Sequence, residues 1–211
     1  IVQSVPEPIN PPGMHLPPNS AALARSSRFN SLRPLTTSAS QSPTIRVNVT
    51  PGGSKSLSLS IDGPYLIREV ESRRELLRGK SLQSCNVESS GAGIRIGRDR
   101  ISEKKLEIVP TSQPSIRVND HLYLGLVRLY RRTDDRVSAV NVLPVEDYLA
   151  SVVDSEMPAS FPEAARQAQA VVARTYALYQ KEHADRASVY DLFSSQRSQK
   201  YLGVEYVDGT G

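Results

Sequence analysis

The chain has 211 residues, of which 38% are hydrophobic, and it carries a formal net charge of +4. This length allows one ordinary domain with a tail, or two small domains. The basic residues are spread over separate segments instead of forming one stripe, which argues against a nucleic-acid-binding protein. No apolar run in the sequence reaches the length of a membrane span.

Potential metal ligands are few in this sequence. Cys85 is the only cysteine, which excludes an internal disulfide and a cysteine-based metal site, and we interpret it as a small buried hydrophobe. His15, His121 and His183 do not have the spacing of metal ligands. We therefore expect neither a metal nor a cofactor.

Residues 1–43 are rich in proline, serine and asparagine. Such a segment buries too little apolar surface to offset the entropy lost on ordering, so it is predicted to be a flexible linker. The chain begins at Ile1 instead of methionine, which is consistent with an upstream signal peptide or membrane anchor. We therefore expect an exported protein of the cell envelope.

The next hundred residues alternate with period two, as half-buried strands do. From Ser56 to Ile61, for example, serines alternate with two leucines and an isoleucine. Asn119-Asp120 and Asp134-Asp135 are typical of turns between strands. We predict an antiparallel, meander-rich β module with strands at residues 45–49, 57–61, 65–70, 93–97, 105–109, 115–118, 122–130 and 137–143.

From Pro144 the apolar period changes to 3.6, which predicts two buried helices joined by an elbow. The first helix should end before Pro158, because the residue preceding a proline avoids the α region. The second is predicted from near Ser160, with Ser160 and Glu163 as a capping box, to about His183. The predicted fold class is therefore α+β, with a β-rich part followed by a helix–elbow–helix segment. These parts span residues 44–143 and 144–211.

Glu156 lies in the elbow, within Ser-Glu-Met-Pro and between the two apolar helices. We expect its carboxyl group to be partly desolvated, which favours the protonated form that a general acid needs. The alternative is that Glu156 caps the second helix or meets a nearby arginine. Asp154 is a possible second carboxylate near Glu156, or it faces solvent.

Arg174 is surrounded in sequence by alanines and valines, so little of its helix is expected to face water. A buried cation needs a partner, because an unpaired buried charge is very costly. That partner could be Glu156, another carboxylate or a substrate. The structural alternative is an ion pair that fixes the two helices together.

The segment PVEDYLASVVDSEMPASFPEAARQAQAVVARTY resembles the signature of the sporulation stage II protein D family, SpoIID, which includes the LytB amidase-enhancer proteins. The family pattern combines Val-Val-x-x-Glu-Met-Pro with a later Ala-Gln-Ala-x-x-Ala-Arg-Thr-Tyr. Further on, SQKYLG at residues 198–203 is similar to the family's Ser/Cys-Gln-x-Tyr-x-Gly motif. The resemblance covers about residues 44–211 and is most specific from 141 to 203.

The resemblance implies a lytic transglycosylase that cleaves the β-1,4 bond between N-acetylmuramic acid and N-acetylglucosamine in glycan strands stripped of peptides. It places the catalytic acid at Glu156. This residue would protonate the glycosidic oxygen and then help the C6 hydroxyl attack C1, leaving a 1,6-anhydro end without water or metal. By the same match, Arg174 belongs to the site, and Gln199 and Tyr201 are substrate-groove residues.

A non-catalytic peptidoglycan-binding protein, or an activator of an N-acetylmuramoyl-L-alanine amidase, remains the alternative on the same scaffold.

Two departures of this sequence from the family pattern bear on the expected site. Some members hold zinc through two cysteines and a histidine before the Gln-x-Tyr motif, whereas residues 193–198 here are Phe-Ser-Ser-Gln-Arg-Ser. The family domain usually continues well beyond that motif, so we expect the SpoIID-like domain at residues 44–211 to be truncated at its C-terminal end.

Overall fold

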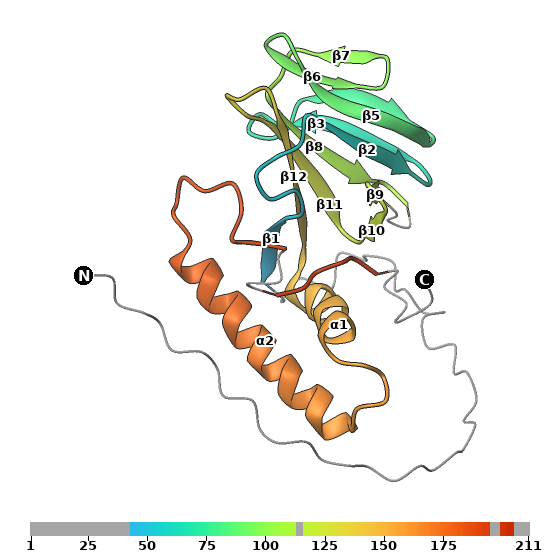
Figure 1. Cartoon of the computed structure of the whole chain (residues 1–211). Coiled ribbons are helices and arrows are strands. Elements are labelled where there is room, and N and C mark those ends of the chain that lie inside the picture. Colours follow the sequence, from blue (N-terminus) through green and yellow to red (C-terminus); the bar gives the residue numbers. More distant parts are fainter. Residues whose placement is uncertain (1–42, 113–115, 195–198, 205–211) are drawn as a thin grey trace. The chain divides into compact units, whose positions relative to one another are not determined.

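The computed structural model describes residues 43–112, 116–194 and 199–204 (Figure 1). Apart from Pro43, the predicted linker lies outside these residues, so its flexibility stays a prediction. Within the described residues the strands form two sheets, of seven and six strands, and two helices follow in the chain. The predicted α+β class is thereby confirmed.

The seven-stranded sheet contains the strand that leads into the first helix and the strand that follows the second. Among the strands that the structure describes, the pair of β1 and β13 is parallel and the other ladders of this sheet are antiparallel. The order is β13 (Leu192–Phe193), β1 (Thr44–Asn48), β12 (Val137–Pro144), β11 (Leu126–Arg131), β8 (Lys105–Pro110), β3 (Tyr65–Glu69) and β4 (Glu75–Gly79).

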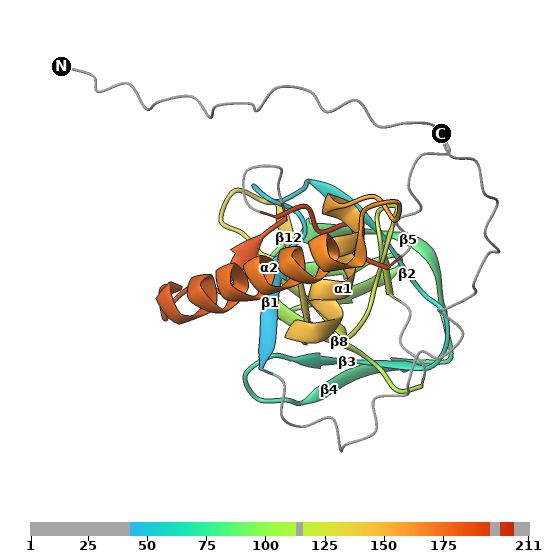
Figure 2. The same ribbon diagram turned by 90° about the horizontal axis from the view of Figure 1, so that it is seen from below.

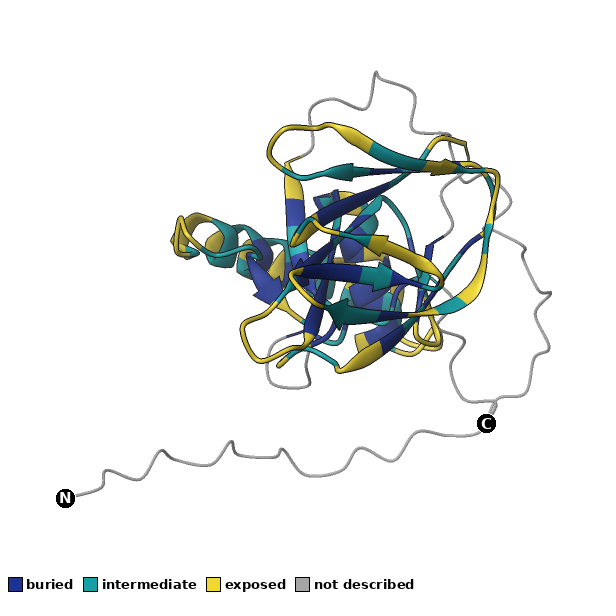
Figure 3. Ribbon diagram, turned by 90° about the horizontal axis from the view of Figure 1, so that it is seen from above, coloured by how far each residue is buried: buried dark blue, intermediate teal, exposed yellow. Residues whose placement is uncertain are grey.

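The six-stranded sheet is antiparallel throughout. Its order is β10 (His121–Tyr123), β9 (Ile116–Val118), β2 (Ser56–Ile61), β5 (Leu82–Ser90), β6 (Gly93–Ile96) and β7 (Asp99–Ile101). Alternate residues of its strands, such as Leu57 and Leu59, join alternate residues of the other sheet, such as Leu106 and Ile108, in one hydrophobic cluster. The period-two pattern therefore marks the buried faces, which are dark blue in Figure 3.

Three strands, β4, β5 and β7, were not predicted from the sequence. In β5 only Val87 is buried, so the apolar alternation is weak there. Pairing with β2 on one side and β6 on the other satisfies its backbone instead. Cys85 of β5 is only partly buried, so its interpretation as a buried hydrophobe was too strong, although it packs against the core cluster.

The single strand predicted over residues 122–130 is wrong, because this segment forms β10 and β11 in different sheets. The chain passes between the sheets at Gly125, whose φ of +76° suits glycine. A Cβ at this position would lie 2.3 Å from the carbonyl oxygen of Val142. The close approach of two backbones thus decides where the strand breaks.

Helix α1 (Val145–Glu156) follows β12 without an intervening loop, and α2 (Glu163–His183) lies beside it (Figures 1 and 2). The predicted apolar stripe of α1 is buried, and the helix ends at the extended residue Met157, before Pro158. Neither helix is long and apolar enough to cross a membrane. The buried residues of the stripe are Val145, Tyr148, Leu149, Val152 and Val153.

Two expectations about α2 are wrong. Ser160 and Glu163 do not form a capping box, because Pro162 occupies the N-cap position and no side chain caps the helix. The helix is also not buried, since only Ala173 and Ala177 are inaccessible while Val171 and Val172 are exposed. Alanine and valine content alone therefore did not indicate where this helix packs.

Candidate active site at the end of helix α1

Glu156 is the last residue of α1 and is exposed. The backbone N–H of Lys200 donates a hydrogen bond of 2.6 Å to its Oε1 atom. The expected desolvation of this carboxyl group is therefore not present in this arrangement. Instead, Glu156 is an accessible carboxylate with one oxygen fixed by a peptide group, which leaves Oε2 free of hydrogen-bond donors among the described residues.

Arg174 is not buried, which corrects that expectation, and of the partners considered for it the structure shows another carboxylate instead of Glu156. Its side chain is 41% exposed and binds the carboxylate of Glu146 through Nε at 3.1 Å and Nη2 at 2.5 Å. Glu146 and Glu156 lie ten residues apart on α1, or about 15 Å along the helix axis. Arg174 thus contacts the opposite end of α1 from Glu156. It forms an ion pair that joins the two helices, which is the structural alternative considered from the sequence.

A second ion pair between the helices involves Asp154, the other carboxylate considered for the site. Arg166 of α2 binds Asp154 through Nη2 at 2.5 Å and donates from Nη1 to the carbonyl oxygen of Met157. Together with the Arg174–Glu146 pair, this contact sets α1 and α2 antiparallel. Asp154 is consequently occupied in holding the elbow and is not a free second carboxylate.

The segment of residues 199–204 lies along α1 and supplies the N–H group that hydrogen-bonds to Glu156. The Tyr148 hydroxyl donates to Oε1 of Gln199 at 2.7 Å, and the Ser151 hydroxyl donates to the carbonyl oxygen of Gly203. Sequence reasoning did not identify Ser151 as a residue that fixes this segment to α1. A serine within an apolar helical stripe was the available signal, but its partner, more than fifty residues away, could not be read from the pattern.

Tyr201 of this segment is buried, with 1% of its surface exposed. Its ring lies between those of Tyr148 and Tyr123, with centroid distances of 5.0 and 5.6 Å. Its hydroxyl donates to Oδ1 of Asn141 at 2.6 Å, and burial raises the pKa of Tyr201 well above its ordinary value. The phenol is therefore neutral and serves as a hydrogen-bond donor.

Gln199 and Tyr201 were expected to line a substrate groove. Both are buried, and the hydrogen bonds described above connect them to Tyr148 and Asn141. In this arrangement they fasten the segment that carries Lys200, so their direct contact with a substrate stays a prediction. Sequence reasoning did not identify Asn141 as part of this network. Its side-chain N–H groups donate hydrogen bonds to the carbonyl oxygens of Leu124 and Leu126.

Another carboxylate of α1, Asp147, is partly buried, and desolvation followed by the charge of Glu146 raises the pKa of Asp147. Nine residues separate it from Glu156, which places the two on opposite sides of the helix because each residue turns it by about 100°. Asp147 is therefore not a second acid for the same bond.

Ser155, next to Glu156, has a buried hydroxyl without a hydrogen-bond partner among the described residues.

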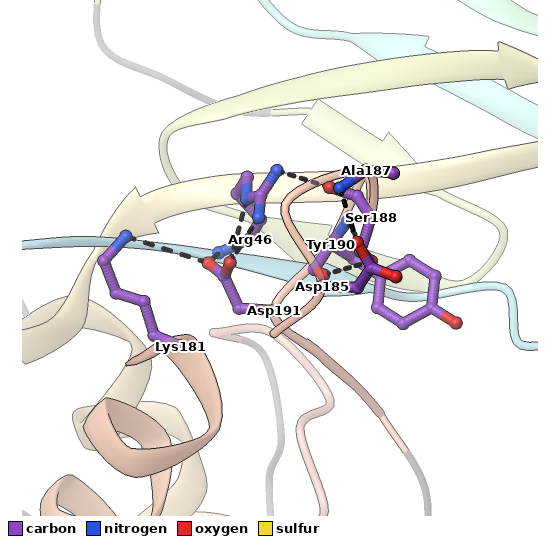
Figure 4. A network of polar contacts seen from close by, with 7 residues as sticks. All are labelled: Arg46, Lys181, Asp185, Ala187, Ser188, Tyr190 and Asp191. Atoms are coloured by element: carbon purple, nitrogen blue, oxygen red, sulfur yellow. Dashed lines mark hydrogen bonds and ion pairs between the residues drawn. The ribbon is translucent and has the colours of Figure 1, made fainter. Parts of the chain in front are cut away.

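The connection that follows α2 is held to β1 by a buried carboxylate (Figure 4). Asp191 accepts hydrogen bonds from the backbone N–H of Arg46 at 2.8 Å and from its Nε at 3.0 Å, and Lys181 approaches at 3.9 Å. Arg46 also donates to the carbonyl oxygen of Ser188. This network fixes β13 beside β1 and so sets the starting point of the segment that reaches Glu156.

The zinc ligands found in some family members would fall in residues 193–198, of which 195–198 lie outside the described residues. Among the described residues, no three of the His, Cys, Asp and Glu side chains are grouped so that they could hold a metal ion. The expectation of a site without metal or cofactor stays a prediction.

Comparison with known proteins finds a family model that matches part of the chain. An uncharacterized protein of Brachyspira hyodysenteriae (strain ATCC 49526 / WA1) is 28% identical over 148 residues, which cover 70% of this chain but only 39% of that relative. No solved structure matches the chain. Residues 133–210 match the family SpoIID, described as stage II sporulation protein. The part of the chain that contains both helices and Glu156 therefore matches the SpoIID family model, in agreement with the motifs in the sequence.

Proposed function

We propose that this protein is a lytic transglycosylase that cleaves the β-1,4 bond between N-acetylmuramic acid and N-acetylglucosamine in denuded peptidoglycan strands. The SpoIID match supports a cell-wall related function. The observation that carries the finer proposal is the accessible carboxylate of Glu156, held at the end of α1 by the Lys200 N–H. Its substrate lies in the cell envelope, so the proposal includes export.

Glu156 acts twice in the proposed reaction. As a carboxylic acid it gives its proton to the glycosidic oxygen while the bond to C1 breaks. As a carboxylate it then accepts the proton of the C6 hydroxyl, whose oxygen forms the new bond to C1. The proton count closes without water, and the product is a 1,6-anhydromuramoyl end.

The hydrogen bond from Lys200 suits this double role. The N–H on Oε1 fixes the direction of the carboxyl group, while Oε2 exchanges the proton.

The alternative proposal is a non-catalytic glycan-binding protein or an activator of an N-acetylmuramoyl-L-alanine amidase. One observation favours it. Arg174, Gln199 and Tyr201 do not converge with Glu156 on an open surface, because the first pairs with Glu146 and the other two are buried. On this reading Glu156 would contact a glycan without cleaving it.

The test is digestion of denuded glycan strands, with the products identified by mass spectrometry. Wild type should release 1,6-anhydro ends, and Glu156→Gln should abolish release while glycan pull-down is retained. Glu182→Gln, which changes an exposed acid at the other end of α2, is the matched control and should cleave normally. Glycan binding by wild type without any anhydro product would refute catalysis and favour the binding protein.

A further inference from the structure

A buried carboxylate in the seven-stranded sheet is surrounded by three arginines that lie far apart in the sequence. Glu107 of β8 is fully buried, and Arg68 of β3 and Arg128 of β11 are its partners across the two adjacent ladders. Arg68 contacts Oε2 through Nε and Nη2, each at 2.5 Å. Arg128 contacts Oε1 through Nη2 at 2.9 Å and Nε at 3.0 Å, and Arg73 adds a third guanidinium on Oε2.

These arginines exceed what Glu107 needs. A carboxylate has about four acceptor positions, which the two bidentate partners can fill, whereas each guanidinium has about five N–H donors. Among the described residues, the side chains of Arg68 and Arg73 have no polar partner other than Glu107. The side chains of Arg68, Arg73 and Arg128 are 28%, 52% and 19% exposed. All three side chains are therefore accessible to solvent, and Arg68 and Arg73 carry N–H donors that no other described residue accepts.

Arg73 is the least expected member of the group. It lies in the turn between β3 and β4 with a φ of 59°, a conformation that glycine adopts at lower cost. The position nevertheless carries an arginine whose side chain turns back onto the sheet and contacts Glu107. A hydrogen bond to an already satisfied carboxylate does not by itself account for a third cation.

Nearby acids do not remove the excess charge. Lys105 binds Glu71. Glu69 accepts the N–H of Ser72, and hydrogen bonds with Glu71 and Ser72 lower the pKa of Glu69 to about 2, so it stays ionised. Three guanidinium groups contact the single carboxylate of Glu107, which leaves an excess of two positive charges within these contacts.

We propose that the arginine cluster, defined as Arg68, Arg73 and Arg128 around Glu107, binds the phosphate group of a phosphomonoester ligand. Such a group carries a charge of about −1.5 to −2 at pH 7 and three acceptor oxygens, which match the excess charge and the N–H donors of Arg68 and Arg73 that Glu107 does not use. A carboxylate has one charge and two oxygens and matches less well. This proposal does not depend on the activity proposed for Glu156.

The test is calorimetric titration of the full chain with glycerol phosphate at low ionic strength, where screening is weak. Wild type should show saturable binding. Arg73→Gln removes the most exposed guanidinium and leaves Glu107 with two partners, so binding should weaken by about tenfold. Arg78→Gln is the matched control, because Arg78 is an exposed arginine of β4 that pairs with Glu75 instead, and it should bind like wild type.

Equal binding by wild type and Arg73→Gln would overturn the proposal, as would equal weakening in Arg78→Gln, which would show attraction to net charge only. Acetate at matched ionic strength should bind more weakly, and equal affinity would overturn the assignment to phosphate. If Arg73→Gln does not fold by circular dichroism, Arg73→Lys replaces it. That variant keeps the charge but loses the planar fork, so binding as tight as wild type would again refute the site.

Discussion

Removing a single hydroxyl, in Tyr201→Phe, tests how the segment beside Glu156 is held. The ring remains, so no cavity forms, and the change removes only the 2.6 Å hydrogen bond to Asn141. The buried Oδ1 atom of Asn141 is then left without this donor, which costs about 1–3 kcal/mol. For a domain of this size, we expect Tm to fall by roughly 2–12 °C.

Urea unfolding of wild type and Tyr201→Phe measures this cost directly. Tyr179→Phe is the matched control, because Tyr179 is exposed and its hydroxyl has no hydrogen bond within the described residues, so its effect should stay within about 0.5 kcal/mol. A double-mutant cycle with Asn141→Ala should give a coupling of about 0.5–3 kcal/mol. A coupling near zero, or equal effects of the two tyrosine variants, would refute the assigned contact.

Three further predictions concern the sheet and the helices. Burial raises the pKa of Glu107, but hydrogen bonds from its arginines outweigh burial and leave the pKa lowered, so the carboxylate stabilises the fold above its unfolded pKa and this contribution is lost as pH falls through the folded pKa. The free energy of unfolding lost in Glu107→Gln, measured with urea, should therefore be large at pH 7 and shrink in acid. A difference that does not depend on pH would contradict this prediction. Val172→Glu should change the free energy of unfolding by less than about 0.5 kcal/mol, because this side chain is 63% exposed. Ala173→Leu, at the adjacent buried position, should cost about 1–3 kcal/mol in the same assay. Equal effects of the two substitutions would show that α2 is packed differently. Ser160→Ala should leave Tm unchanged because no side chain caps α2, and a loss of about 1 kcal/mol, typical of a removed cap, would restore the capping box.

The elements that the sequence predicted well are those whose own side chains face the core. Alternation in β2 and the 3.6-residue stripe of α1 each describe one buried face, and the structure buries them. The elements that were missed or misjudged depend on neighbours. Strand β5 exists because two other strands pair with its backbone, and α2 is largely exposed despite its alanines and valines.

Sequence alone determined the position of Glu156 at a helix end and the SpoIID motifs around it, because a proline two residues later stops α1 regardless of what packs nearby. Only the tertiary structure decided the partners. Arg174 pairs with Glu146 because antiparallel helices bring distant positions together, and Glu156 meets a peptide N–H because Asn141 and Tyr201 fasten a remote segment beside it. Such contacts join residues separated by tens of positions, so no local pattern contains them.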